Sequence, residues 1–131
     1  MDKQIIKNII IEKQVAIPNY KLIHRDFLFG DKSNYILVGL RRAGKSYLLY
    51  QDIQTRLQKG EQSAQDILYI NFEDERLSSL KAEELGIILD SYMELYPGKQ
   101  PLIYLDEIQN VEGWEKFARR LADSQYRVMI T

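Results

Sequence analysis

The 131-residue sequence lacks cysteine and contains a single histidine and a single tryptophan. Without cysteine the chain forms no disulfide, no thiolate zinc site and no thiol nucleophile, a composition that fits a reducing cytosol. The histidine, His24, has no nearby pattern of carboxylates or cysteines, so it indicates neither a metal site nor a catalytic base. Long hydrophobic runs are also missing, whereas a membrane helix needs about 20 apolar residues. These absences predict a cytoplasmic protein with no membrane partner.

The charges nearly cancel, because 18 basic residues face 19 acidic ones and the net charge is −1. A dedicated nucleic-acid-binding domain normally carries a basic excess, so nucleic acid is not indicated as a partner. The apolar content of 45% excludes a disordered chain. At this length one domain buries roughly two-thirds of the surface of its unfolded chain, enough for a hydrophobic core.

Helical and strand-like patterns alternate along the chain. Helical spacing of apolar residues predicts helices over 3–17, 46–59, 85–96 and around 114–121, and short apolar runs predict strands over 34–38, 67–72, 101–105 and 126–131. Trp114 falls on the apolar stripe of the last helix and is expected to pack in the core. Gly60 suits a left-handed helix end, and Gly86 would lie inside a helix. The alternation predicts an α/β fold with a parallel sheet.

A phosphate-binding pattern, G-x-x-x-x-G-K-[ST], follows the first expected strand and precedes a helix. Its residues are Gly39, Leu40, Arg41, Arg42, Ala43, Gly44, Lys45 and Ser46. The glycines let successive backbone amides point at a phosphate, and the helix adds the positive end of its dipole. Lys45 is expected between the β- and γ-phosphates and the Ser46 hydroxyl on Mg²⁺, so the pattern predicts a nucleoside triphosphate with magnesium. For the variable Arg41 and Arg42, ordinary surface charge is favoured, and contact with phosphate oxygens or with a neighbouring subunit remains the alternative.

Two adjacent carboxylates, Asp106 and Glu107, end the third expected strand. Ligands of open parallel sheets bind at the carboxyl ends of strands, and neighbouring residues of an extended segment point to different sides. Asp106 is therefore expected to hold Mg²⁺ together with Ser46, and Glu107 to orient or deprotonate the attacking water. A solvated acidic pair is the alternative interpretation.

The segments GLRRAGKS, YINFEDERL and LIYLDEIQNVEGWEKFARRL together resemble the AAA-type phosphate-loop ATPase domain found at the N-terminal side of larger bacterial and archaeal two-domain ATPases. The resemblance implies a three-layer α/β/α core in which the strand over 126–131 lies between the acidic-motif strand and the phosphate-loop strand. Residues 1–33 would be an N-terminal helix and lead-in. Residues 34–131 would be a partial core without the fifth strand, the sensor residue past the fourth strand and the C-terminal domain.

The resemblance also implies a switch role for Asn71, a polar residue near the end of the second strand that would hydrogen-bond Glu107 until a partner binds. A turn-forming Asn is the alternative. The acidic run Glu73 to Glu75 is expected to be solvated rather than metal-binding. Nothing in the sequence identifies an arginine finger, and neither Arg119 nor Arg120 is assigned that role.

The leading prediction is ATP binding and Mg²⁺-dependent hydrolysis of the γ-phosphate, coupled to a further domain, with a protein partner or self-association. Glu107 supports hydrolysis, because a pure binding site needs no water-activating carboxylate. A nucleotide-responsive switch or interaction module with little turnover is the alternative, and a phosphate-loop kinase is a weaker third.

Overall fold

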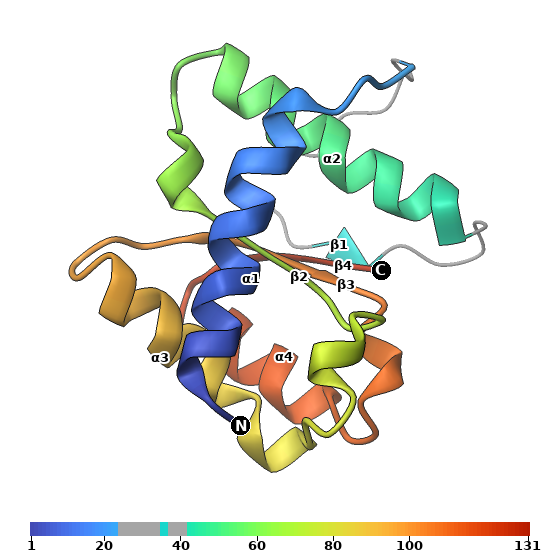
Figure 1. Cartoon of the computed structure of the whole chain (residues 1–131), viewed down its shortest axis with the longest axis vertical. Helices are drawn as coiled ribbons and strands as arrows, with labels where there is room; N and C mark the ends of the chain where they lie inside the picture. Colours follow the sequence, from blue (N-terminus) through green and yellow to red (C-terminus); the bar gives the residue numbers. More distant parts are fainter. Residues whose placement is uncertain (24–34, 37–41) are drawn as a thin grey trace.

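The structure is a computed structural model that describes residues 1–23, 35–36 and 42–131 (Figure 1). Three of the residues predicted to bind phosphate, Gly39, Leu40 and Arg41, lie outside the described residues, as does His24. Within the part that is described, the α-helices are α1 (Lys3–Ala16), α2 (Arg42–Gln58), α3 (Gly86–Leu95) and α4 (Glu115–Asp123). The strands are β1 (Tyr35–Ile36), β2 (Ile67–Asn71), β3 (Leu102–Asp106) and β4 (Arg127–Ile130).

All the strand pairs are parallel, and the order across the sheet is β1-β4-β3-β2. The predicted α/β class with a parallel sheet is therefore confirmed. The position of β4 between β3 and β1 is the arrangement that the resemblance implied. Because each strand connects to the next through a helix, the carboxyl ends of the strands meet at one edge of the sheet.

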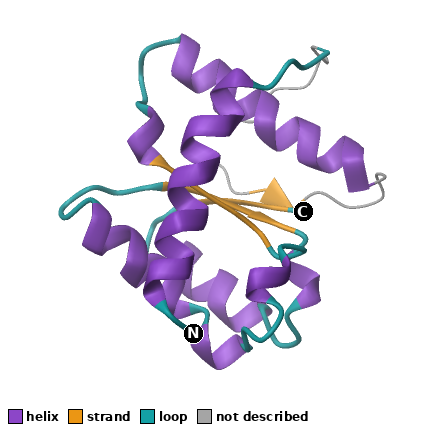
Figure 2. Ribbon diagram, in the orientation of Figure 1, coloured by secondary structure: helices purple, strands orange, loops and turns teal. Residues whose placement is uncertain are grey.

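Helices cover both faces of the sheet (Figure 2). Alternate residues of a strand point to opposite faces, and the core divides accordingly. On one face α2 and Ile17 pack on Ile67, Tyr69, Tyr104 and Met129. On the other face α1, α3 and α4 pack on alternate strand residues, Leu68, Ile70, Ile103, Leu105, Val128 and Ile130. The partly buried Trp114 packs against this second cluster, as predicted.

Local signals set the helix ends. The Asp2 side chain accepts a hydrogen bond of 2.9 Å from the Gln4 amide and caps α1, and Gly60 follows α2 with φ of +75°. Two boundaries differ from prediction. α2 begins at Arg42 rather than near Ser46, so the second half of the phosphate-binding pattern is helical. Gly86 begins α3 rather than lying inside it, so a mid-helix glycine penalty does not apply.

None of the helices within the described ranges is sufficiently long and apolar to span a bilayer.

Candidate functional site

A row of polar residues crosses the sheet where the strands end. Asn71 pairs in register with Asp106, and the pairing of Leu105 with Ile130 places Thr131 level with Asp106 on the next strand. The alternation of strand residues directs all three side chains to the face covered by α2. Residues far apart in the sequence thus form one polar edge beside α2.

Asp106 is the centre of this row. Its side chain is fully buried, and it accepts hydrogen bonds from three hydroxyl groups. The Ser46 Oγ donates to Oδ2 at 2.7 Å, the Tyr69 hydroxyl donates to the same oxygen, and Thr131 Oγ1 donates to Oδ1. A buried carboxylate without such partners would be strongly unfavourable. The contact between Ser46 and Asp106 brings together the two residues that the sequence assigned to one metal.

α2 positions the second half of the phosphate-binding pattern. Ser46 lies in the second turn of the helix that begins at Arg42, with Lys45 directly before it, and both are partly buried. In Figure 1 the N-terminal end of α2 points toward the edge of the sheet where β4 and the chain end. The positive end of the helix dipole therefore faces the same region as the Asp106 carboxylate.

Glu107 is 2% exposed and adopts left-handed backbone angles, φ 58° and ψ 39°. Its amide donates to Thr131 Oγ1 at 2.9 Å, its carbonyl accepts from Asn110 Nδ2 at 3.1 Å, and its Oε2 accepts from Gln109 Nε2. Thr131 therefore binds the backbone of Glu107, and Gln109 binds its carboxylate. The left-handed angles show that the strand geometry ends at Asp106, so Glu107 does not continue the extended segment on which the predicted division of roles was based. That division stays a prediction.

Sequence reasoning missed Thr131, Gln109 and Tyr69. Thr131 lay at the end of the last expected strand, where its polar character was a signal for the site but did not identify its partners. Tyr69 gave no signal of its own, because a tyrosine in an apolar strand is ordinarily a core residue.

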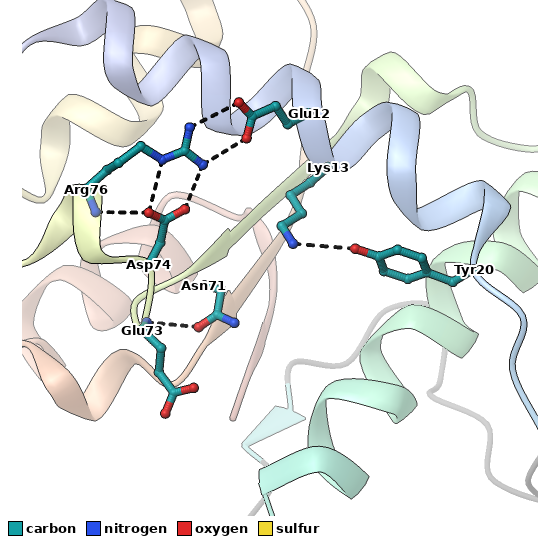
Figure 3. Close-up of polar contacts among 7 residues, drawn as sticks. All are labelled: Glu12, Lys13, Tyr20, Asn71, Glu73, Asp74 and Arg76. Carbon is teal, nitrogen blue, oxygen red and sulfur yellow. Dashed lines mark hydrogen bonds and ion pairs between the residues drawn. The ribbon is translucent and has the colours of Figure 1, made fainter.

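The Asn71 side chain has a local partner. Its Oδ1 accepts the Glu73 amide at 2.9 Å, the hydrogen bond of a turn-forming asparagine (Figure 3). This is the contact that the turn alternative requires. A switch role toward Glu107 stays a prediction, although the register of β2 and β3 places Asn71 beside Asp106.

The segment after β2 is tied to α1 by Arg76. Its guanidinium donates to both Glu12 carboxylate oxygens, at 3.0 and 2.8 Å, and to Asp74 Oδ2 at 2.8 Å (Figure 3). The hydrogen bonds from Arg76 lower the pKa values of Glu12 and of Asp74 below their ordinary values. Asp74 is therefore engaged in an ion pair on the surface of the protein.

A group of tyrosines lies between α1, α2 and the sheet. The Tyr69 hydroxyl is 3.3 Å from the Tyr50 hydroxyl, and the Tyr50 ring packs edge-on against Tyr20. The Lys13 ammonium lies 5.8 Å from the centre of the Tyr69 ring and 3.5 Å from the Tyr20 hydroxyl. Burial, and then the negative charge of Asp106, raise the pKa of Tyr69, which keeps its hydroxyl protonated as a donor.

The Arg120 side chain packs against its neighbours. Its guanidinium lies 5.5 Å from the centre of the Phe117 ring, and its Nη2 would be 3.1 Å from a Cβ placed on Gly86. Among residues 1–23, 35–36 and 42–131 there is no group of three or more His, Cys, Asp or Glu side chains arranged to hold a metal ion.

A parallel α/β sheet with a polar site at its carboxyl edge, beside a helix that carries the glycine-lysine-serine pattern, defines a phosphate-loop-like domain. A protein-family model described as an AAA domain matches residues 31–131, and the chain belongs to this family.

Two relatives match significantly. An uncharacterized protein of Methanocaldococcus jannaschii is 37% identical over 134 residues, which cover 100% of this chain and 29% of the relative. An uncharacterized protein of Haemophilus influenzae is 38% identical over 89 residues, 66% of this chain and 21% of the relative. The chain thus spans less than a third of the length of these relatives. No solved structure matches significantly.

Proposed function

We propose that the domain binds ATP and hydrolyses its γ-phosphate in a magnesium-dependent reaction. The observation that carries the proposal is the 2.7 Å contact between Ser46 Oγ and Asp106 Oδ2 across sixty positions of sequence. Phosphate-loop enzymes hold their metal between a loop hydroxyl and an acidic strand end, and the two oxygens here are adjacent. Membership of the AAA domain family supports the same function.

The donor set fits Mg²⁺. This ion prefers oxygen ligands, keeps several waters and commonly uses one or two protein side chains together with substrate phosphates. Ser46 and Asp106 provide such a pair. When bound, the ion would neutralise charge on the β- and γ-phosphate oxygens.

The other residues of the site would each have a separate role in binding or hydrolysis. Residues 39–46 would bind the phosphates, with the Lys45 ammonium on the β- and γ-phosphates. Glu107 would orient a water and accept its proton while the water oxygen bonds to the γ-phosphorus and the bond to the bridging oxygen breaks. Thr131, bonded to both Asp106 and the Glu107 amide, would hold the two acidic residues in a fixed relationship. Asn71 would act on Glu107 only after leaving the Glu73 amide.

The proposal also includes the domain organisation, the partners and the location of the protein. Residues 1–33 would be a lead-in to the core over 34–131, and hydrolysis would drive a further domain, as the much longer relatives suggest. A protein partner or self-association is part of this proposal, as is a cytoplasmic location.

A nucleotide-responsive switch with little turnover is the second candidate. It is favoured by the hydrogen bond between Gln109 and the Glu107 carboxylate, which occupies an oxygen that hydrolysis would use. In a switch this contact would persist with nucleotide bound.

Single-turnover hydrolysis separates the two candidates. The intact protein is mixed with a substoichiometric amount of labelled ATP and Mg²⁺, and phosphate release is compared between the wild type and Glu107→Gln. Hydrolysis predicts a rate at least about a hundredfold lower in the variant, because the general base is lost, with ATP binding retained. Equal slow rates in both proteins favour the switch, and no binding of Mg-ATP by the folded wild type refutes both.

A further inference from the structure

We propose that Tyr69 is a positioning residue for Asp106, and that its buried hydroxyl fixes the carboxylate in the orientation in which it contributes to Mg²⁺-dependent nucleotide binding. The inference rests on the proposed function, and it assigns a role to a residue of β2 that belongs to neither the phosphate-binding pattern nor the acidic pair.

Two donors meet on one oxygen of Asp106. The Tyr69 hydroxyl and the Ser46 hydroxyl both donate to Oδ2, whereas Thr131 donates to Oδ1. Hydrogen bonds to both oxygens prevent the carboxylate from rotating about its terminal bond. Of these donors Tyr69 has a fully buried side chain and lies 37 positions from Asp106. Its ring is fixed by the core of the α2 face, so the hydroxyl is held in place before any ligand arrives.

The neighbouring strand offers a natural comparison. Tyr104 pairs in register with Tyr69, points to the same face and is equally buried. Its hydroxyl donates to Asp52 on α2 at 2.6 Å, a carboxylate that also accepts from Arg56 at 2.9 Å. Two buried tyrosines side by side therefore serve two different carboxylates, and only the one on β2 serves the candidate metal ligand.

The surroundings of Tyr69 help to hold its ring in place. The Lys13 ammonium lies 5.8 Å from the centre of the ring, a cation–π contact that attracts the ring to the α1 side chain. Figure 3 shows the Lys13 side chain extending from α1 toward the Tyr20 hydroxyl. Partners of this kind, which orient a metal ligand without touching the metal, commonly change metal affinity about 10- to 100-fold when removed.

The experiment compares Tyr69→Phe with the matched variant Tyr104→Phe in the intact protein. Each change removes one hydroxyl from a buried ring and keeps its apolar contacts. Calorimetric titration with a non-hydrolysable ATP analogue is repeated at increasing Mg²⁺ concentrations. The midpoint is the Mg²⁺ concentration that gives half of the metal-dependent gain in affinity.

For Tyr69→Phe we expect a midpoint about tenfold higher than in the wild type, with analogue affinity in the absence of Mg²⁺ unchanged. For Tyr104→Phe we expect the wild-type midpoint. A purely structural role for Tyr69 would change neither midpoint, or would change both variants alike, and either result overturns the proposal.

A second comparison tests whether Tyr69 acts through Asp106. In an Asp106→Asn background, adding Tyr69→Phe should leave the remaining Mg²⁺ dependence within about twofold, because the group that it positions is gone. A further tenfold shift in that background would overturn the proposal.

A structure of the wild type with Mg²⁺ and the analogue gives a test that needs no folded variant. The Tyr69 hydroxyl should stay within hydrogen-bond distance of Asp106, and its separation from Asp106 would overturn the inference. Failure of the proposed function gives a different result, since the wild type itself would then show no Mg²⁺-dependent binding.

Discussion

The hydroxyl of Ser46 donates a 2.7 Å hydrogen bond to Oδ2 of Asp106, although sixty positions separate the two residues in the sequence. One residue lies in the second turn of α2 and the other is the last residue of β3. This contact brings the phosphate-binding pattern next to the acidic end of β3, where a metal ion and a triphosphate would be held.

Ser46→Ala should weaken Mg²⁺-dependent ATP binding by about tenfold or more, because the alanine can neither ligate the metal nor hold Asp106. Ser46→Thr keeps a hydroxyl and should retain most of the metal dependence. Calorimetric titration with and without Mg²⁺ measures both variants. If alanine and threonine bound Mg-ATP equally well, the hydroxyl would have no part in the metal site.

Thr131→Val should lower the free energy of unfolding by about 1–3 kcal/mol, because it leaves the buried Glu107 amide without its acceptor and removes a donor to Asp106. Valine matches threonine in shape, so loss of packing does not explain the effect. Thr131→Ser should stay much closer to the wild type. Urea denaturation of the three proteins measures the difference, and equal stabilities of the valine and serine variants would contradict the prediction.

The alternation of helices and strands was sufficient to predict the fold, because each strand of this sheet is a short apolar run and a helix connects each strand to the next. The contact between Ser46 and Asp106 was also predictable, since both residues belong to patterns with a known meeting point at the carboxyl edge of a sheet. The start of α2 was not predictable from the sequence, because Arg42 to Lys45 belong to the phosphate-binding pattern and also fit a helix. The glycines of the pattern do not mark where the loop ends and the helix begins.

The hydroxyl contacts of Tyr69 and Thr131 depend on strand register. Tyr69 reaches Asp106 only because β2 and β3 pair as Asn71 with Asp106, and Thr131 does so only because β4 lies on the other side of β3. These strand registers bring together segments that are far apart in the sequence, and no local sequence pattern encodes the registers. Asn71 illustrates the opposite case, since its local turn signal agreed with the observed bond to the Glu73 amide.

Glu94→Gln should remove an acid-sensitive contribution to stability. Hydrogen bonds from Lys3 and then Lys7 lower the pKa of Glu94 from its ordinary value of 4.5 to about 2, and they tie α3 to α1. A carboxylate whose pKa is lower in the folded state stabilises the protein above its unfolded pKa and loses this contribution as the pH falls toward the folded pKa.

The melting temperature of Glu94→Gln should therefore lie below that of the wild type at pH 6, and the two should converge between pH 4.5 and about 2. Glu61→Gln is the matched control, because Glu61 is exposed and has no ion pair within the described part of the chain. Its melting curve should follow the wild type at each pH. A difference for Glu94→Gln that persisted unchanged to pH 2 would show that charge is not its cause.

Glu107 and Gln125 both adopt left-handed backbone angles, with φ of 58° and 66°. For residues other than glycine this conformation costs about 1–2 kcal/mol, whereas the greater freedom of unfolded glycine offsets part of the gain on substitution. Gln125→Gly should therefore raise the free energy of unfolding by about 0.5–1 kcal/mol without affecting hydrolysis. Urea denaturation and phosphate release measure the two properties.

Glu107→Gly should also stabilise the protein through relief of backbone strain, and it should abolish ATP hydrolysis. It relieves the same backbone strain, and the exposed Gln109 amide that loses its acceptor regains water. Strain retained at a functional residue is the expected cause of such a trade-off between stability and activity. If Glu107→Gly unfolded more readily than the wild type while Gln125→Gly gained stability, the contacts of the Glu107 carboxylate would outweigh its strain, and the residue would be a structural element of the site.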